Sequence, residues 1–489
     1  MRRNFAGNRC PFVCTVALAV LVAGCGGDDP SSTGNSDELT AVHVEGTTFR
    51  DARGRQVLLR GYNARVENIF DVTFDDGRIA LEDIPPFDEN DARRFEELGF
   101  NVLRLPVDWS GLEPHPLQYS EAYMRRIDTV VDLARLHHFY VLIDMHQDAY
   151  SKEFGEDGEP LWAIVPPPPM LLQGPLTDLD QRRLSMPVLE AGVNFFANVP
   201  ALDGRPLQEA FTAAVQQLVR RYVGNPAVVG YEAFNEPIIL FNDPILDAFH
   251  QRFAAAVHAI DPRAPIFFEP TALRNQSDRA RVPTAPWPNG PGVYAPHIYT
   301  TVFSPPNDSW ASEDPSMLSA SMTAAAQEAA AWGTPLFVGE FGIDQTLERG
   351  PLYLMAELDL QDQFLASSTV WVWRETGYWG LKDADGVERD ATVQAVTRPY
   401  PRAVAGDLLA IERPAPGALR VRYRANDRIA GQPNEVGLSS AQFSDYEIRC
   451  DGVAVPFVRH TGRGEFSCPG GSGERTFDVI GKSATTAVN

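Results

Sequence analysis

The chain has 489 residues, of which 44% are hydrophobic and 22% are charged. This length suits one large domain with a smaller one, and the composition excludes a chain that is disordered throughout. Its 42 Lys and Arg residues against 65 Asp and Glu residues give a net charge of -23. Because no basic tract offsets this charge locally, nucleic acid is not expected as a partner.

The long apolar stretch of the chain lies at its beginning, in residues 11–25. It is too short for an ordinary membrane span, which excludes a multi-span membrane protein. It follows a segment that carries Arg2, Arg3 and Arg9, and this order is typical of export signals, with a buried N-terminal helix as the alternative. We therefore predict a signal peptide over residues 1–24.

Residues 22–25 (VAGC) resemble the lipobox of bacterial lipoproteins, in which the cysteine is lipidated and becomes the mature N-terminus. The resemblance implies that Cys25 carries the lipid and that residues 25–40 form a flexible, polar tether. An anchor of this kind holds a protein on a membrane surface without crossing it. We therefore expect an exported protein, either a lipoprotein at the bacterial cell surface or a secreted protein.

From residue 57 onward, buried strands alternate with amphipathic helices. The predicted strands are residues 57–63, 101–107, 140–146, 228–235, 265–269, 293–299, 336–341 and 369–373. Helices are predicted between them, for example at residues 120–138 and 207–222. A doubly wound sheet would normally carry a Gly-rich nucleotide loop, which is missing here. The pattern therefore predicts an α/β TIM barrel over residues 41–396.

One connection is much longer than a barrel turn. Residues 150–205 separate the third strand from its helix, and loops beyond ~15 residues in a compact domain are usually functional or disordered. Apolar residues such as Trp162 and Phe195 argue against disorder. Together with Phe303 and Trp310, this insertion is predicted either to form an apolar patch for alkyl chains or to pack against the barrel.

Residues 397–489 lose the helical periodicity and show short alternating runs between turns, which predicts an antiparallel β-sandwich. Cys450 and Cys468 lie in this segment. In an oxidising compartment we expect them to form a disulfide, with two buried free thiols as the alternative. A zinc site is disfavoured because no CxxC or HxxxH spacing accompanies them.

In a TIM barrel the carboxyl ends of the strands converge on one face, so residues from different strands can share a site. The polar and aromatic residues predicted at or just after these ends are Arg104, His146, Asp148, Asn235, Glu236, His297, Tyr299, Glu340 and Trp373. Among them, Glu236 and Glu340 lie on nearly opposite strands. Such a pair suits hydrolysis of a glycosidic bond, which needs one protonated and one ionised carboxyl group.

The surroundings of the two carboxyl groups are predicted to separate their roles. We expect Arg104 and Tyr299 to stabilise the ionised group, and its negative charge to raise the pKa of the other. His146 and His297 have no third ligand at matching spacing, so neither a metal ion nor another cofactor is expected. Glu269, at the end of the fifth strand, is a further carboxylate without an assigned role.

With these residues the sequence resembles the clan A retaining glycoside hydrolases of family 5. The family pattern is matched by Arg104, His146, Asn235, Glu236, His297, Tyr299, Glu340 and Trp373. The resemblance implies that Glu236 is the acid/base and Glu340 the nucleophile. It also implies that Asn235 bonds the 2-hydroxyl of the sugar at the cleavage point and that Trp373 is the floor on which this sugar stacks.

A narrower resemblance is to the endoglycoceramidases, which release an intact oligosaccharide from the ceramide of a glycosphingolipid. It rests on residues 142–151 (LIDMHQDAYS), residues 400–407 (YPRAVAGD) and the terminal β-domain, and it implies that Asp148 lines the sugar site. Residues 60–69 (RGYNARVENI) lack the lysine expected in the glucosylceramide-linked enzymes. Either Arg65 replaces this lysine or the sugar preference differs, as in endogalactosylceramidases.

The predicted protein is thus a retaining endo-glycosidase of glycosphingolipids that meets a membrane surface through Cys25 and its insertion. The alternatives are a family 5 β-glycanase or β-glucosidase for a soluble glycan or simple glycoside, an endogalactosylceramidase, and a non-catalytic glycan-binding lipoprotein. The last is disfavoured because binding alone gives no reason to keep both Glu236 and Glu340.

Overall fold

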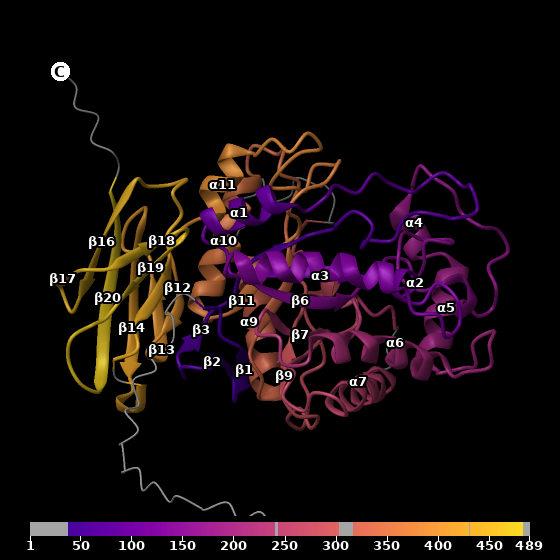
Figure 1. Cartoon of the computed structure of the whole chain (residues 1–489), viewed down its shortest axis with the longest axis horizontal. Coiled ribbons are helices and arrows are strands. Elements are labelled where there is room, and N and C mark those ends of the chain that lie inside the picture. The colour runs from indigo at the N-terminus through magenta and orange to yellow at the C-terminus, as the bar shows by residue number, and fades with distance from the viewer. Residues whose placement is uncertain (1–37, 240–242, 303–315, 430, 483–489) are drawn as a thin grey trace, which may run out of the picture. The chain divides into compact units, whose positions relative to one another are not determined.

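A computed structural model of the chain describes residues 38–239, 243–302, 316–429 and 431–482 (Figure 1). The predicted signal peptide, the lipidation site Cys25, and Phe303 and Trp310 lie outside these described residues. Within them, no helix combines the length and the apolar character that a membrane crossing requires.

Eight parallel strands form a nearly closed barrel, which confirms the predicted fold class. They are β4 (Arg60–Asn63), β5 (Val102–Val107), β6 (Tyr140–Met145), β7 (Val228–Glu232), β8 (Ile266–Phe268), β9 (Gly292–Tyr294), β10 (Phe337–Phe341) and β11 (Ser367–Val370). The sheet order is β10-β11-β4-β5-β6-β7-β8-β9, and bridges from Tyr294 to Leu336 and from Ile298 to Phe341 link its two edges. Because β7 ends at Glu232, the predicted site residues Asn235 and Glu236 lie in the loop that follows it.

Helices alternate with these strands. Outside the insertion they are α1 (Glu89–Glu97), α2 (Trp109–Leu112), α3 (Glu121–Leu136), α6 (Leu207–Tyr222), α7 (Asp243–His258), α8 (Arg274–Ser277), α9 (Ser316–Trp332), α10 (Gly350–Gln363) and α11 (Asp390–Val396). Helix α3 begins where the Ser120 hydroxyl accepts a hydrogen bond from the backbone N–H of Tyr123, as expected of an N-cap. It buries Ile127 and Val131 at helical spacing and lies along β6 (Figure 1).

The insertion at residues 150–205 is largely ordered around short helices. These are η1 (Leu161–Ala163), α4 (Leu179–Arg183) and α5 (Met186–Phe196). Trp162 is buried and its indole N–H donates to the carbonyl of Glu113, while Phe195 packs edge-on against Phe211. These aromatic residues therefore hold the insertion against the barrel. Other apolar residues of the insertion are exposed, notably Leu184 at 69% and Met186 at 73%.

The C-terminal region forms two antiparallel sheets. One contains β1 (Val42–Glu45), β2 (Thr48–Asp51), β3 (Gln56–Val57), β12 (Tyr400–Val404), β15 (Asn434–Gly437), β19 (Arg463–Phe466) and β18 (Val458–His460), in this order. The other contains β13 (Gly406–Glu412), β14 (Ala418–Ala425), β20 (Gly473–Lys482), β16 (Asp445–Cys450) and β17 (Val453–Val455), also in order. A short helix, η3 (Asp427–Ile429), follows β14. Val436 of the first sheet and Val421 of the second share one buried core. Cys450 and Cys468 form a disulfide with their Cα atoms 5.4 Å apart.

The N-terminal strands β1, β2 and β3 belong to the same sheet as the C-terminal strands. Val57 of β3 lies opposite Ala403 of β12. The sequence placed residues 41–56 with the barrel, so the observed sheet differs from the predicted domain boundary. The pairing has a physical reason, because β12 would otherwise present one unpaired row of backbone N–H and C=O groups.

Candidate active site

Arg104 lies at the centre of the barrel and organises the residues around it. This fully buried side chain donates hydrogen bonds to Asn63 (2.9 Å), Glu232 (2.6 Å), Asn235 (2.8 Å) and Glu340 (2.7 Å). Asn235 also donates to the carbonyl of Gln147 at 3.1 Å. The bonds reach carboxylate and amide oxygens from four different strand ends or loops. Arg104 therefore fixes the positions of the groups around it as well as compensating their charge.

Glu340 belongs to β10, and both oxygens of its carboxyl group accept hydrogen bonds. Its Oε1 accepts from Arg104 at 2.7 Å, and its Oε2 accepts from the hydroxyl of Tyr299 at 2.8 Å. Burial, with the nearby negative charge of Glu340, raises the pKa of Tyr299 well above its usual value. The phenol thus stays protonated and remains a donor. Both contacts come from donors, so they fix the orientation of the Glu340 carboxyl group.

Glu236 lies across the site from Glu340. Its backbone has a φ of 42°, a left-handed conformation that is uncommon for residues other than glycine and recurs at functional sites. Its Oε1 accepts hydrogen bonds from the amide of Asn275 at 2.5 Å and from Nδ1 of His297 at 2.9 Å. One carboxylate oxygen of Glu236 lies within 4.8 Å of one of Glu340.

The contact between Glu236 and His297 shifts the pKa values of the two groups in opposite directions. Burial raises the pKa of Glu236, but the hydrogen bond and the positive charge of His297 lower it to about 2. For His297, burial lowers the pKa, but the charge of Glu340 and the bond to Glu236 raise it overall. The expectation that the negative charge of Glu340 raises the pKa of Glu236 is therefore wrong, because the imidazole of His297 contacts both carboxylates.

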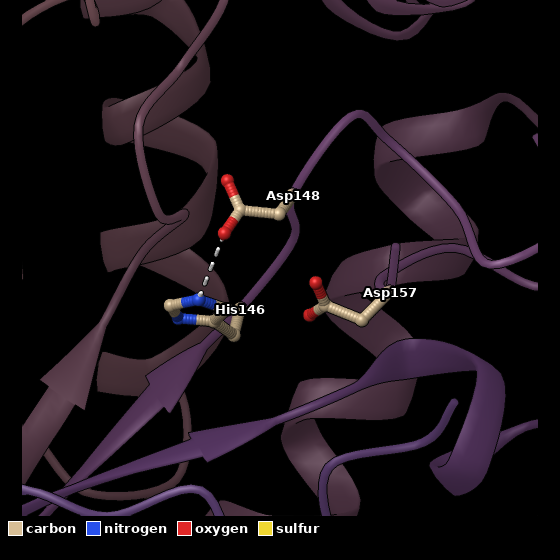
Figure 2. Close-up of side chains that lie close together, drawn as sticks. All are labelled: His146, Asp148 and Asp157. Atoms are coloured by element: carbon tan, nitrogen blue, oxygen red, sulfur yellow. Dashed lines mark ion pairs between the residues drawn. The ribbon is translucent and has the colours of Figure 1, made fainter. Parts of the chain in front are cut away.

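His146 and Asp148 form a second part of the site (Figure 2). His146 bonds to Asp144 through Nδ1 at 2.5 Å, and its Nε2 lies 3.9 Å from Asp148. Burial lowers the pKa of His146 to about 4, so this imidazole is neutral at neutral pH. Figure 2 shows the carboxylate of Asp148 directed at the ring, with Asp157 from the following loop beside it. The other oxygen of Asp148 accepts from Arg183 of α4 at 2.7 Å.

Three groups of side chains in this region bring ligand atoms within 4.8 Å of one another, close enough for a metal ion. They are His146 with Asp148 and Asp157, Glu232 with Glu269 and His297, and Glu236 with His297 and Glu340. Each group contains a carboxylate that already binds a guanidinium, since Asp148 binds Arg183 while Glu232 and Glu340 bind Arg104. The negative charge of these clusters is therefore compensated by arginine.

Trp373 does not lie at the site, and its predicted role as the stacking floor is wrong. Its side chain is 1% exposed, its indole N–H donates to Asp91 of α1, and its ring packs edge-on against Phe95. Trp371, two residues earlier, is only partly buried, and its ring is stacked parallel to His146 with centroids 5.7 Å apart. This structure therefore offers Trp371, beside His146, as the aromatic surface of the site.

Other residues at the site were not assigned from the sequence. Arg183 of α4 binds Asp148 and Asn275 of α8 binds Glu236, and nothing in their local sequence marks them. Glu269 accepts from the backbone N–H of Glu236 at 3.2 Å, and burial together with neighbouring carboxylates raises its pKa well above the usual value. Arg65, considered as a replacement for a missing lysine, is buried and bonded to Glu82, Glu156 and Glu375.

A parallel-stranded barrel with two glutamates facing each other at the carboxyl ends of its strands is the arrangement of an O-glycosyl hydrolase. The family model for Cellulase (glycosyl hydrolase family 5) matches residues 51–376. The chain belongs to this family.

Within the family, the chain is similar to endoglycoceramidases. Endoglycoceramidase I of Rhodococcus hoagii is 28% identical over 85% of this chain and 84% of its own length. An endoglycoceramidase of Cyanea nozakii is 25% identical over 81% of this chain and 82% of its own length. Among solved structures, the lactosyl-enzyme intermediate of endo-glycoceramidase II from Rhodococcus sp. superposes with a TM-score of 0.74 at 25% identity. That alignment covers 90% of this chain and 100% of the other.

Proposed function

We propose that this protein is a retaining endo-glycosidase that hydrolyses the β-glycosidic bond between oligosaccharide and ceramide in glycosphingolipids. The observation that carries the mechanism is the approach of Glu236 and Glu340 within 4.8 Å. Retaining glycosidases hold their two carboxyl groups about 5–5.5 Å apart, whereas inverting enzymes leave a wider gap for a water molecule. The similarity to endoglycoceramidases along most of the chain supports the choice of substrate.

In the first step, a carboxylate oxygen of Glu340 forms a bond to the anomeric carbon as the bond from that carbon to the ceramide oxygen breaks. Glu236 donates a proton to the departing oxygen. The proton reaches Glu236 from Nδ1 of His297, which is already hydrogen-bonded to it at 2.9 Å. In the second step, Glu236 removes a proton from a water molecule that attacks the anomeric carbon as the bond from that carbon to Glu340 breaks. The proton then returns from Glu236 to Nδ1 of His297, which restores the starting state.

The test of this assignment is a comparison of substrates. The mature protein is incubated with lactosylceramide, with a ganglioside and with a soluble β-glucan. Intact oligosaccharide together with free ceramide is the expected product of the two glycolipids. Reducing ends released from the glucan alone would show that the substrate assignment is wrong while leaving the family mechanism in place.

The sugar linked to ceramide is either glucose or galactose, and one feature of the site favours testing both. Arg65 is held by three carboxylates, so it does not present a free cation in place of the lysine expected in glucosylceramide-linked enzymes. We therefore propose a comparison of galactosyl- and glucosyl-linked glycolipids that carry the same outer sugars. Faster release from the galactosyl series would assign the protein as an endogalactosylceramidase.

A lipid-linked substrate also needs an apolar surface close to the sugar site, and the insertion offers one. Helix α4 brings Arg183 to Asp148, and Leu184 and Met186 follow with 69% and 73% of their surfaces exposed. We propose that these side chains contact the ceramide or the membrane that contains it. The aromatic residues of the insertion that are buried, such as Trp162, instead serve to attach it.

Replacing Leu184 and Met186 by Glu tests this surface. Each exposed apolar side chain that a lipid covers contributes about 1.5–3 kcal/mol, so we expect at least about a tenfold loss on lactosylceramide in vesicles. Cleavage of a soluble aryl lactoside is expected to be unchanged. Val458→Glu is the matched control, because Val458 is 60% exposed in the β-domain. Equal losses on both substrates would contradict a lipid contact.

We further propose that the protein is exported and anchored through lipidated Cys25. The proposal rests on the basic and apolar order of the first residues and on the VAGC sequence at residues 22–25. In a bacterial host that processes lipoproteins, Cys25→Ser is expected to move the protein from the membrane fraction to the soluble exported fraction. An unchanged membrane fraction would argue against the anchor.

A further inference from the structure

A small pocket lies at the end of the barrel opposite the catalytic carboxylates, where the barrel meets the C-terminal β-domain. Arg60, the first residue of β4, lines it together with Ser368, Tyr400 and Gly437. The cavity has a volume of about 20 Å³. A single water molecule needs roughly 10–15 Å³ of such space, so the pocket has room for one small molecule or a monatomic ion.

Three arginines converge on this pocket, and all three bind one carboxylate. Oδ1 of Asp362 accepts from Arg60 at 3.0 Å, and its Oδ2 accepts from Arg398 at 3.0 Å and from Arg413 at 2.8 Å. Arg60, Arg398 and Arg413 also line the pocket. Asp359 pairs with Arg398, but its side chain is 59% exposed, so its charge is largely screened by water. The buried charge is therefore positive overall.

The excess of buried positive charge affects Arg60 most clearly. It is 6% exposed, and its Nε–H has no hydrogen-bond partner in the part of the chain that the structure describes. A buried donor without an acceptor is costly, the more so when it is charged. Burial, together with the positive charges of Arg398 and Arg413, lowers the pKa of Arg60 to about 10. An anion in the pocket would accept a hydrogen bond from the unpaired Nε–H and would also reduce the repulsion among the three arginines.

We propose that this pocket binds chloride, which accepts a hydrogen bond from Nε of Arg60 and balances the excess charge of the three arginines. Its size suits a monatomic anion. Arg60 begins a barrel strand, whereas Arg413 follows β13 of the β-domain. The anion would therefore strengthen the attachment of the β-domain to the barrel. This site is independent of the glycosidase activity and of its substrate.

Bromide has nearly the same size and charge as chloride and can be located by its anomalous scattering. Crystals of the mature wild-type protein in sodium bromide are expected to show an anomalous peak within hydrogen-bonding distance of Nε of Arg60. Absence of a peak in this pocket would overturn the proposal, and this measurement requires no variant.

Thermal unfolding gives a second measurement. At equal ionic strength, replacing gluconate by chloride is expected to raise Tm by about 1–2 °C, because an anion that binds the folded state stabilises it. The rise is expected to disappear in Arg413→Gln and to persist in Arg420→Gln, since Arg420 is an exposed arginine that pairs with Asp478. Equal Tm values of the wild type in the two salts, or an undiminished rise in Arg413→Gln, would overturn the proposal.

Discussion

Trp371 and Trp373 are two positions apart, yet the structure predicts opposite consequences when each is replaced. Trp373 is enclosed by Tyr62, Phe87 and Phe95, and its indole N–H donates to Asp91 at 3.0 Å. Trp371 is partly exposed beside His146. We expect Trp373→Ala to lower the stability of the protein and Trp371→Ala to lower its activity.

The loss of unfolding free energy expected for Trp373→Ala follows from the burial of this side chain. Removing a large aromatic side chain from a packed core costs about 3–5 kcal/mol of unfolding free energy, through lost burial and through the cavity left behind. The hydrogen bond to Asp91 adds about 1 kcal/mol. Lys382 still binds Asp91 at 2.7 Å, which limits the cost of leaving this carboxylate buried. Trp373→Phe keeps most of the ring contacts and is expected to recover most of the loss.

For Trp371→Ala, the expected loss of kcat/KM comes from a lost contact with the substrate. A sugar ring that stacks on the indole loses that contact in Trp371→Ala, and a loss of about 1.4–2.8 kcal/mol corresponds to a 10- to 100-fold lower kcat/KM. The unfolding free energy is expected to fall by only about 1 kcal/mol, the usual effect of a substitution outside the core.

Guanidinium denaturation measures the first effect, and cleavage of a soluble aryl lactoside at 25 °C measures the second. Each variant is the control for the other, since both lie in one short segment. A Trp373→Ala protein with wild-type stability but a large loss of kcat/KM would refute the placement of the two rings. A Trp371→Ala protein with full activity would refute the proposed stacking surface.

Three other variants test the remaining parts of the structure. Replacing Glu340 by Gln is expected to lower kcat by about 10⁴-fold or more and to prevent a covalent glycosyl-enzyme from being trapped and detected by mass, because the amide is not a nucleophile. Arg183→Gln removes a positive charge that lowers the pKa of Glu236. The alkaline limb of the pH profile of kcat/KM, which reports loss of the proton that the acid must donate, should therefore move to higher pH, whereas Arg182→Gln leaves it in place, and equal shifts would contradict the role of Arg183. Cys468→Ser opens a disulfide that spans 18 residues, which should cost about 3 kcal/mol in unfolding experiments and leave activity at 25 °C unchanged.

Several features of the site could be predicted because they depend on local sequence. Glu340 belongs to a buried strand, and Glu236 follows another within a few residues, so the convergence of strand ends in a barrel brings them together. Arg104 was predicted for the same reason. Arg183 and Asn275 were not, since each lies in a short helix whose position relative to the barrel depends on packing far away in the sequence.

The two tryptophans show how limited the local pattern is beyond the end of a strand. Strand β11 ends at Val370, so the alternation of side chains that a strand imposes no longer applies to Trp371 and Trp373. Their directions depend on what surrounds them, and Phe95 of α1 and His146 of β6 are distant in the sequence. A motif alone therefore assigned the stacking role to the wrong ring.

The sequence by itself determined the barrel, the β-domain and the pair of glutamates. The spacing of apolar residues and the position of a residue at the end of a strand both depend on residues that are close together in the chain. Tertiary structure alone decided that the N-terminal strands join the C-terminal sheet, and that His297 contacts both glutamates and lowers the pKa of Glu236. Both outcomes depend on distances between groups far apart in the chain. Electrostatic energies and strand pairing respond to those distances, and no local pattern contains them.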